Sequence, residues 1–186
     1  MKIAITGHTK GLGAALVKLL TPDHEIVGFS RTNGYDIEQD ATIERIIAEV
    51  EDCDIFINNA KSWWSQIDMF SKLLLDWQGQ RKRIINIGSH VTVWNYKTDR
   101  LNFPKISANH YIAMKTALKA ASYNAWENNA WPLVHLVQPG PFVNTGFIPD
   151  ERTHMTAEQV AKSIVDSIIN SELLVMELTI RPYPKF

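Results

Sequence analysis

Tyr111 and Lys115 stand four positions apart in the segment NHYIAMKTALKAA, so on a helix both side chains lie on one face. A tyrosine with an unperturbed pKa of about 10 needs about 4 kcal/mol of help to ionise near neutral pH. A lysine ammonium about 4 to 5 Å from the hydroxyl supplies roughly 3 to 4 kcal/mol at an effective dielectric constant near 20. A surface tyrosine beside a solvated lysine has the same spacing. The energies nevertheless favour an acid/base pair suited to carbonyl and alcohol chemistry.

A glycine pattern near the amino terminus is the second group with chemical potential. The run TGHTKGLG follows a strand-like segment and opens a helical pattern, which is the context of a dinucleotide-binding turn. Gly7 permits the tight turn, Gly11 lets the backbone approach a pyrophosphate, and Gly13 allows close packing of helix on strand. A plain turn is the alternative. At the first strand of the chain, the pattern predicts a dinucleotide site.

These residues need a scaffold, and short apolar runs that alternate with helical patterns predict one along the whole chain. The runs that indicate strands are residues 2–6, 26–29, 54–57, 84–87, 133–137 and 174–180. The residues that share helical faces are Leu12, Leu16, Leu19 and Leu20, then Ile43, Ile46, Ile47 and Val50, then Phe70, Leu73, Leu74 and Trp77. A capping box in TAEQ, with Thr156 and Gln159, predicts the start of the last helix. This alternation is typical of a parallel sheet covered on both faces.

Composition limits the partners and the location. The 186 residues suit one compact domain, 1–186. The net charge of -1 gives no basic excess for neutralising phosphates, so we expect neither nucleic acid nor a membrane surface as a partner. Cys53 is the only cysteine, and no carboxylate or second histidine recurs at ligand spacing, so we expect no disulfide and no metal. The sequence has no leader-like or bilayer-spanning run, so we expect a cytoplasmic protein.

Five motifs occur in a telling order: TGHTKGLG, INNA at 57–60, INIGS at 85–89, YIAMK at 111–115 and QPG at 138–140. Each motif is weak alone, but the ordered set resembles the short-chain dehydrogenases/reductases across nearly the whole chain. The resemblance implies an α/β fold with a Rossmann-like doubly wound parallel sheet in three layers, α/β/α. It also implies an enzyme that interconverts a carbonyl and an alcohol on a small molecule by hydride transfer with a nicotinamide cofactor.

The family's residue roles carry over to matching positions. Ser89 would hydrogen-bond the substrate oxygen, Tyr111 would donate its proton, and Lys115 would lower the tyrosine pKa and bind ribose hydroxyls. Asn59 would lie under the cofactor, and Asp36 would meet the adenine edge. The full set of implied cofactor residues is Gly7, Thr9, Lys10, Gly11, Leu12, Gly13, Ser30, Arg31, Asp36, Ile37, Asn59, Ala60, Tyr111, Lys115, Pro139 and Gly140.

The residues after the second predicted strand indicate NADP(H). Ser30 stands where NAD-preferring relatives usually carry an acid, so no carboxylate there would repel a 2′-phosphate. Arg31 follows, and its planar guanidinium can bind phosphate through two hydrogen bonds. Lys10 can approach the same phosphate from the glycine loop. The alternative is two solvated surface cations.

Several positions depart from the family pattern. Lys61 replaces the glycine that usually follows Asn-Asn-Ala. Asn59 and Ser89 are only 30 positions apart, so we expect a helix, or most of one, to be missing. In the family a threonine follows the Pro-Gly pair, and in this sequence its role falls to either Asn144 or Thr145. The family's helical asparagine has no clear counterpart, and the open candidates are Ser62, Ser65 and Gln66.

Residues 61–66 and 90–110 lack a clear period and follow strand ends, where open α/β sheets bind ligands. His90 and His110 flank the catalytic positions and suit hydrogen-bonded structural roles. Aromatic side chains in such loops line a substrate site about as often as they seal a core edge or a subunit contact. The aromatic residues of these two segments that we consider are Trp63, Trp64, Trp94, Tyr96 and Phe103.

The leading hypothesis is therefore an NADP(H)-dependent oxidoreductase. A binding protein of the same fold, an NADP(H) sensor with little turnover, is the alternative, since the middle of the chain is short and Lys61 is unusual. Retention of Ser89, Tyr111 and Lys115 argues against it. A sugar-nucleotide epimerase would need a substrate-binding extension that this chain lacks. Because the family pairs subunits through the helix that carries the tyrosine, we expect a homodimer.

Overall fold

The computed structural model describes residues 1–93, 105–142 and 155–182. Asn144 and Thr145, together with Trp94, Tyr96 and Phe103, lie outside these residues. The strands are β1 (Lys2–Thr6), β2 (Glu25–Phe29), β3 (Ile55–Asn58), β4 (Arg83–Ile87), β5 (Leu133–Pro139) and β6 (Glu177–Ile180). The helices are α1 (Gly11–Leu20), α2 (Asp40–Glu49), α3 (Ser65–Asp76), α4 (Lys105–Asn128) and α5 (Ala157–Ile164). Short helical turns are η1 (Arg31–Asn33), η2 (His90–Thr92) and η4 (Val165–Ile169).

The six strands form one parallel sheet in the order β2-β1-β3-β4-β5-β6. The order reverses at β1, which pairs with β2 on one side and β3 on the other, so the loops after β1 and β3 diverge at a topological switch point. All six predicted strands are present. The last is shorter than expected, because regular pairing begins at Glu177 rather than at residue 174.

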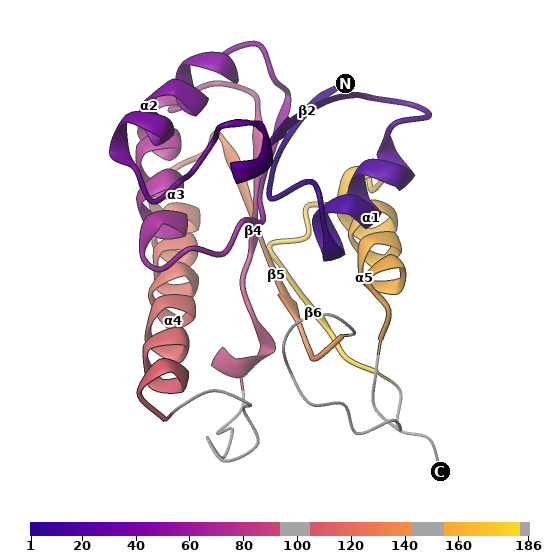
Figure 1. Cartoon of the computed structure of the whole chain (residues 1–186). Coiled ribbons are helices and arrows are strands. Elements are labelled where there is room, and N and C mark those ends of the chain that lie inside the picture. The colour runs from indigo at the N-terminus through magenta and orange to yellow at the C-terminus, as the bar shows by residue number, and fades with distance from the viewer. Residues whose placement is uncertain (94–104, 143–154, 183–186) are drawn as a thin grey trace.

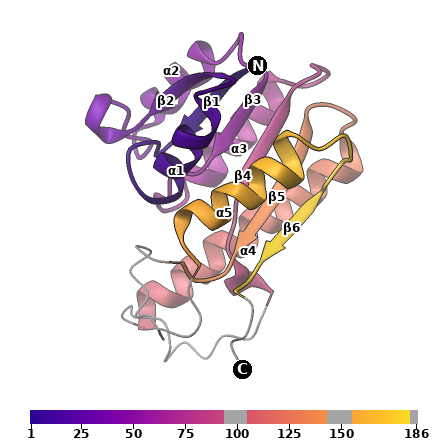
Figure 2. The same ribbon diagram turned by 90° about the vertical axis from the view of Figure 1, so that its right-hand side faces the viewer.

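Helices cover both faces of the sheet. Figure 1 shows α2, α3 and α4 on one side of the strands and α1 and α5 on the other, and Figure 2 shows α1 and α5 lying across the near face. Alternate residues of β1 supply the two cores, since Ile3 and Ile5 pack with α1 and α5, whereas Ala4 packs with α2 and α3. The fold is therefore the predicted Rossmann-like, three-layer α/β/α arrangement.

Local sequence signals explain where α5 begins. Thr156 Oγ1 accepts a hydrogen bond from Gln159 N at 3.2 Å, and Thr156 N donates one to Gln159 Oε1 at 2.8 Å. This is the predicted capping box. Val160, Ile164 and Ile168 then face the sheet as buried residues, the last from the wider turn η4.

The connection between Asn59 and Ser89 corrects one expectation. The short spacing predicted that a helix, or most of one, was missing, yet α3 occupies 12 residues of this segment. Met69, Phe70 and Leu73 bury one face of α3 against the sheet, and the burial of this apolar face stabilises the helix. The irregular region before Tyr111 is also shorter than predicted, because α4 already begins at Lys105. Among the described residues, no helix combines the length and apolar character needed to cross a bilayer.

Candidate active site

The glycine loop joins β1 to α1 at the carboxyl edge of the sheet. Gly7 has a φ of 69°, a left-handed conformation that favours glycine, and its N–H donates to Phe29 O at 2.7 Å. A Cβ on Gly13 would lie 2.1 Å from Gly7 O, so only glycine lets α1 approach the loop this closely. A Cβ on Gly11 would meet nothing within 4 Å, which leaves the backbone open to a ligand. Leu12 packs in the core, so only its backbone can take part in binding.

Asn59 fixes this loop to the end of β3. Its Nδ2 donates to Thr6 O at 3.0 Å and to Gly7 O at 3.3 Å. The backbone N–H groups of Asn59 and Ala60 donate to Thr6 Oγ1 at 3.0 and 2.9 Å. The side chain of Asn59, which the sequence placed under the cofactor, therefore holds together the two loops that would border it.

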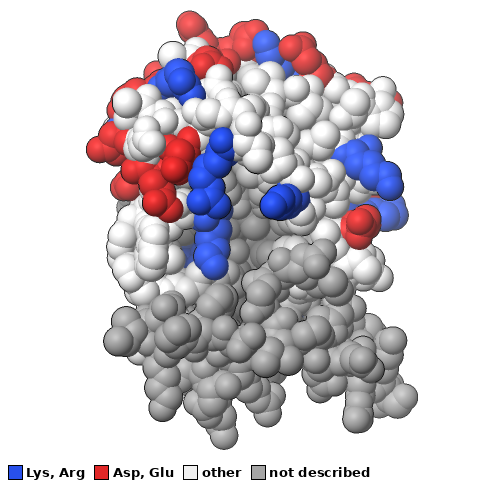
Figure 3. Space-filling model, in the orientation of Figure 1, with Lys and Arg blue, Asp and Glu red and all other residues white. Residues whose placement is uncertain are grey.

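A cavity of about 330 Å³ opens between these loops and the loop that follows β2. Many of the residues expected to bind the cofactor line this cavity. They are Gly7, Thr9, Lys10, Ser30, Arg31, Asp36, Ile37, Asn59 and Ala60. Figure 3 shows basic side chains bordering a hollow on this face, with acidic side chains beside them. A phosphate-bearing nucleotide fits these residues, because the backbone of the glycine loop at Gly7, the residue before α1 and three cations line one hollow. The cations are Lys10, Arg31 and Lys61.

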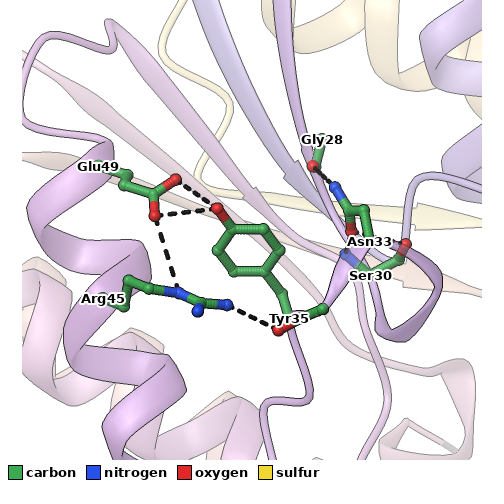
Figure 4. A network of polar contacts seen from close by, with 7 residues as sticks. Gly28, Ser30, Asn33, Tyr35, Arg45 and Glu49 are labelled. Atoms are coloured by element: carbon green, nitrogen blue, oxygen red, sulfur yellow. Dashed lines mark hydrogen bonds and ion pairs between the residues drawn. The ribbon is translucent and has the colours of Figure 1, made fainter.

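The cavity wall after β2 is braced by a polar network (Figure 4). Asn33 Nδ2 donates to Gly28 O at 2.8 Å, and its Oδ1 accepts from Ser30 N at 2.8 Å and Ser30 Oγ at 3.0 Å. Behind it, Tyr35 Oη donates to the Glu49 carboxylate, and the Arg45 guanidinium stacks on the Tyr35 ring at 4.1 Å. These contacts hold Ser30 inward and leave Arg31 exposed at the cavity.

Both cations proposed for the 2′-phosphate line this cavity. Lys10 comes from the glycine loop and Arg31 from the first position of η1, and both are exposed. Acidic side chains also reach the cavity, since Asp36 and Glu38 line it and the Ser62 hydroxyl donates to Glu38. The Ser62–Glu38 bond joins the loop after β3 to the loop after β2 across the cavity.

Ser89 and Tyr111 come together at the end of β4. Ser89 caps η2, with its Oγ accepting from Val91 N at 3.4 Å, and its side chain lies close enough to Tyr111 on α4 to affect the pKa of the tyrosine. Burial raises the pKa of the Tyr111 hydroxyl above its ordinary value, and the nearby Ser89 side chain lowers it only in part. The spacing of Tyr111 and Lys115 predicted a lowered pKa for the tyrosine, and this prediction is wrong because burying the phenolate is costly.

Lys115 lies deeper than the tyrosine. Its Nζ donates to Gln66 Oε1 at 2.7 Å and to Ile87 O at 2.8 Å, and it is 5.9 Å from the centre of the Tyr111 ring. Burial, together with the charge of Lys61, lowers the pKa of Lys115 to about 7. Its hydrogen-bond acceptors are neutral, so no carboxylate among these contacts offsets the cost of burying the ammonium.

Gln66 is the functional candidate that sequence reasoning left open beside Ser62 and Ser65. It lies in the first turn of α3, 4% exposed, and its Nε2 donates to Asn58 O at 2.7 Å and Ile87 O at 3.0 Å. The same side chain therefore ties the ends of β3 and β4 together and presents its oxygen to Lys115. Of the three candidates, Gln66 is the one in contact with Lys115.

Lys61 and two tryptophans form the outer border of the site. Lys61 Nζ lies 4.8 Å from the centre of the Tyr111 ring, and burial lowers the pKa of this ammonium. The Trp63 and Trp64 rings lie 5.0 and 5.7 Å from the His110 ring, one helical position before the tyrosine. Both tryptophans are exposed.

Pro139 and Gly140 lie at the carboxyl end of β5, farther along the same edge. Gly140 N donates to Ile180 O at 2.8 Å, and both residues are buried against β6. Neither is among the described residues that line the cavity. Their contacts in this structure are those of strand pairing, and a cofactor contact stays a prediction.

Solved structures give a consistent comparison for this fold. An alcohol dehydrogenase from the archaeon Thermococcus sibiricus, complexed with 5-hydroxy-NADP, aligns over 100% of both chains at 16% identity with a TM-score of 0.73. Serine dehydrogenase from Escherichia coli aligns over 98% of both chains at 20% identity and a TM-score of 0.69. A short chain dehydrogenase from Burkholderia cenocepacia in complex with NADP aligns over 96% of this chain and 87% of that one, at 15% identity and a TM-score of 0.74.

The described chain thus has the fold of the short-chain dehydrogenases/reductases. No protein-family model matches the sequence, and a search of curated proteins finds no match.

Proposed function

We propose that the protein is an NADP(H)-dependent oxidoreductase of the short-chain dehydrogenase/reductase type, which interconverts a carbonyl and an alcohol on a small molecule. The observation that carries the proposal is the contact between Ser89 and Tyr111 at the edge of the sheet where the glycine loop opens its cavity. Lys115 lies beneath the same tyrosine. Proton donor, hydroxyl partner and dinucleotide cradle therefore share one edge of the sheet.

The chemistry follows from the positions of these groups. The residues of the glycine-loop cavity would hold a reduced nicotinamide cofactor, which would supply a hydride to the carbonyl carbon. Tyr111 supplies the proton to the carbonyl oxygen, so the products are an alcohol and the oxidised cofactor, and Tyr111 regains its proton from solvent. Ser89 donates a hydrogen bond to the same oxygen. The raised pKa of Tyr111 keeps its hydroxyl protonated before the reaction, as a proton donor requires.

NADP(H) rather than NAD(H) is proposed because Lys10 and Arg31 line the cavity, while Ser30 offers no carboxylate to a 2′-phosphate. The neighbours solved with NADP or 5-hydroxy-NADP support the assignment by their fold alone. A small-molecule substrate, a cytoplasmic location, a single domain and a homodimer belong to the same proposal. A monomeric mass by light scattering at micromolar concentration would contradict the homodimer.

An NADP(H)-binding sensor with little turnover is the second candidate. The observation in its favour is that neither lysine brings the pKa of Tyr111 below its ordinary value, whereas burial raises it. A sensor needs the cavity but no working acid. The two functions differ in one measurement, the turnover of the protein with cofactor and a carbonyl compound.

The test is a screen of aldehydes, ketones, quinones and pterins with NADPH, read by loss of the reduced cofactor's absorbance. Fluorescence titration with NADPH and NADH runs in parallel. Turnover that requires Tyr111 supports the enzyme. Tight NADPH binding with no turnover on any compound supports the sensor, and no binding of either cofactor contradicts both.

A further inference from the structure

Glu177 lies on β6, the strand at the edge of the sheet beside β5. Figure 2 shows this strand with α4 behind it, on the far face of the sheet. The carboxylate accepts a hydrogen bond from Tyr123 Oη, and its Oε1 lies 3.7 Å from Lys119 Nζ. Both partners belong to α4, the helix that also carries Tyr111 and Lys115. Glu177 therefore fixes α4 to the edge of the sheet.

The same carboxylate has a second partner on the neighbouring strand. Gln138 of β5 is fully buried, and its Nε2 donates to Glu177 Oε1. The Oε1 of Gln138 accepts from the hydroxyl of Thr92, a residue of η2. Thr92 Oγ1 also lies 3.1 Å from Ser89 O, and Ser89 caps this turn. A chain of polar side chains thus leads from Glu177 to the turn that Ser89 begins.

The carboxylate of Glu177 sets the direction of this chain. A carboxylate can only accept hydrogen bonds, so the amide nitrogen of Gln138 must face it. The amide oxygen of Gln138 then faces Thr92 and can only accept, so the Thr92 hydroxyl must donate to it. The reversed amide would place its oxygen against the carboxylate, and two acceptors without a proton between them repel each other. One charged group therefore determines the orientation of both neutral side chains.

Glu177 is charged at neutral pH. Burial acts to raise the pKa of its carboxyl group. The hydrogen bonds from Tyr123 and Gln138, together with the charge of Lys119, nevertheless bring this pKa below its ordinary value. The bond to Glu177 raises the pKa of the Tyr123 hydroxyl, so this group stays protonated and remains a donor.

We propose that Glu177 is a positioning residue for the reaction, which holds the turn of Ser89 and the helix of Tyr111 in one arrangement without touching substrate or cofactor. The reaction itself rests on the proposed function. The positioning role rests on two sets of bonds that meet at one carboxylate, because one set leads to Ser89 and the other ends on the helix of Tyr111. Both hydroxyls must meet the same carbonyl oxygen, and a misplacement of about 1 Å can cost about 100-fold in rate.

A purely structural role is the alternative. The bonds of Glu177 would then add to the free energy of unfolding and leave the geometry of the site unchanged in the folded protein. The two roles give different results, because only positioning lowers kcat at a temperature well below the melting temperature.

The experiment compares variants of the full-length protein at a temperature at which each remains folded. Glu177→Leu removes both acceptor oxygens at similar size, whereas Glu177→Gln keeps one acceptor and an amide that can pair with a reversed Gln138. Thr92→Val interrupts the chain at its other end. Glu44→Leu is the matched control, because Glu44 of α2 also joins two elements through its ion pair with Lys72 of α3, away from the site.

With a substrate from the screen, Glu177→Leu should lower kcat about 10- to 100-fold, and Thr92→Val should account for part of this loss. The affinity for NADPH should stay unchanged, because neither residue is among the described residues that line the cavity. Glu177→Gln should recover most of kcat, and Glu44→Leu should retain all of it. The double variant Glu177→Leu with Thr92→Val should be little slower than Glu177→Leu, since both changes interrupt one chain.

Unchanged kcat in a folded Glu177→Leu protein would overturn the inference. Fully additive losses in the double variant would overturn it as well, because Glu177 would then act by a route that does not pass through Thr92. A loss of NADPH affinity as large as the loss of kcat would show that the whole site had loosened, which contradicts a specific positioning role.

Amide hydrogen exchange separates this inference from the proposed function, because it needs no turnover. The N–H of Val91 donates to Ser89 Oγ, and that of Thr92 donates to Ser89 O at 3.2 Å. Glu177→Leu should speed the exchange of these two amides about 10-fold, and Glu44→Leu should leave it unchanged. Absence of turnover with every compound contradicts the proposed function only. Faster exchange would in that case still support the link from Glu177 to the Ser89 turn, and unchanged exchange would refute it.

Discussion

The ammonium nitrogen of Lys115 lies 2.7 Å from Oε1 of Gln66, and this bond joins the helix that carries Tyr111 to the helix between β3 and β4. Gln66 is itself held by two backbone carbonyls, so its oxygen has little freedom to move. Among the described contacts, Lys115 is held by hydrogen bonds to neutral acceptors rather than by an ion pair. Under the proposed function, Gln66 would act as a positioning residue that holds Lys115 beside the tyrosine.

Gln66→Leu should lower kcat by about 10- to 100-fold, because a hydrogen bond to a charged group contributes roughly 1.5 to 3 kcal/mol. The KM for the carbonyl compound should change less, since Gln66 is not expected to touch it. Ser65→Ala, the neighbouring change in the same helical turn, is the control. Steady-state kinetics with a substrate from the screen give the comparison. An unchanged kcat in a folded Gln66→Leu protein would rule out the positioning role.

The pKa of Lys115 predicts a pH-dependent stability. Its value in the folded protein is about 7, below the ordinary 10.5 of the unfolded chain, so between these limits the unfolded state binds more protons. The contribution of this group therefore raises the free energy of unfolding as the pH increases from about 7 towards 10.5, and it is constant below the lower limit.

Lys115→Met removes this contribution. The free energy of unfolding of the unmodified protein should rise relative to that of Lys115→Met by at most about 1.4 kcal/mol per pH unit. Urea denaturation at about pH 6, 8 and 9 measures the difference between the two proteins. A difference that does not vary with pH would mean that Lys115 titrates near its ordinary value.

Much of the fold was readable in the sequence, for physical reasons. Strands buried on both faces must be nearly continuous apolar runs, and all six predicted runs form strands. The capping box at Thr156 fixed a helix start from four residues. The positions of Tyr111 and Lys115 on one helix could also be predicted, because they depend only on residues near one another in the sequence. The same holds for the position of Ser89 at the end of a strand.

The missed features depend on contacts between distant segments. The direction of the Tyr111 pKa follows from burial beneath other elements, which spacing does not reveal. The choice of Gln66 over Ser62 and Ser65 depends on which side chain faces Lys115, 49 positions away. Its signal was present in the sequence, since a long amide at the start of an apolar helical face is an unusual core residue.

Tyr111→Phe should abolish turnover, with kcat at least about 100-fold lower, because the proton donor is lost. The phenyl ring remains for Lys61 and Lys115 to contact, so the fold and the affinity for NADPH should persist. Fluorescence titration with NADPH checks binding, and cofactor absorbance checks turnover. Near-normal turnover in this variant would show that another group provides the proton.

Gly13→Ala should destabilise the protein by about 1 to 3 kcal/mol, because its Cβ would lie 2.1 Å from Gly7 O and 2.9 Å from Asn59 Nδ2. Gly11→Ala is the matched control in the same loop. Its Cβ would meet nothing within 4 Å, and its φ of 52° costs alanine about 1 kcal/mol. Thermal denaturation compares the two. The close packing of α1 on the loop would be disproved by equal melting temperatures for Gly13→Ala and the unmodified protein.

Cofactor preference should depend on Ser30 and Arg31. The Ser30 hydroxyl bonds Asn33 and Thr32 beneath the cavity wall, whereas Arg31 is exposed at the cavity and available to a phosphate. The double variant Ser30→Asp with Arg31→Ala places a carboxylate where the 2′-phosphate would lie and removes a cation. NADPH affinity should fall about 10- to 100-fold for the lost charge-assisted contact alone, and the preference should shift to NADH.

Titration with both reduced cofactors at one ionic strength measures this shift in preference. Lys72→Ala controls for lost surface charge, because Lys72 is paired with Glu44 away from the cavity. Tighter binding of NADH than of NADPH by the unmodified protein would refute the assignment of Lys10 and Arg31 to the phosphate.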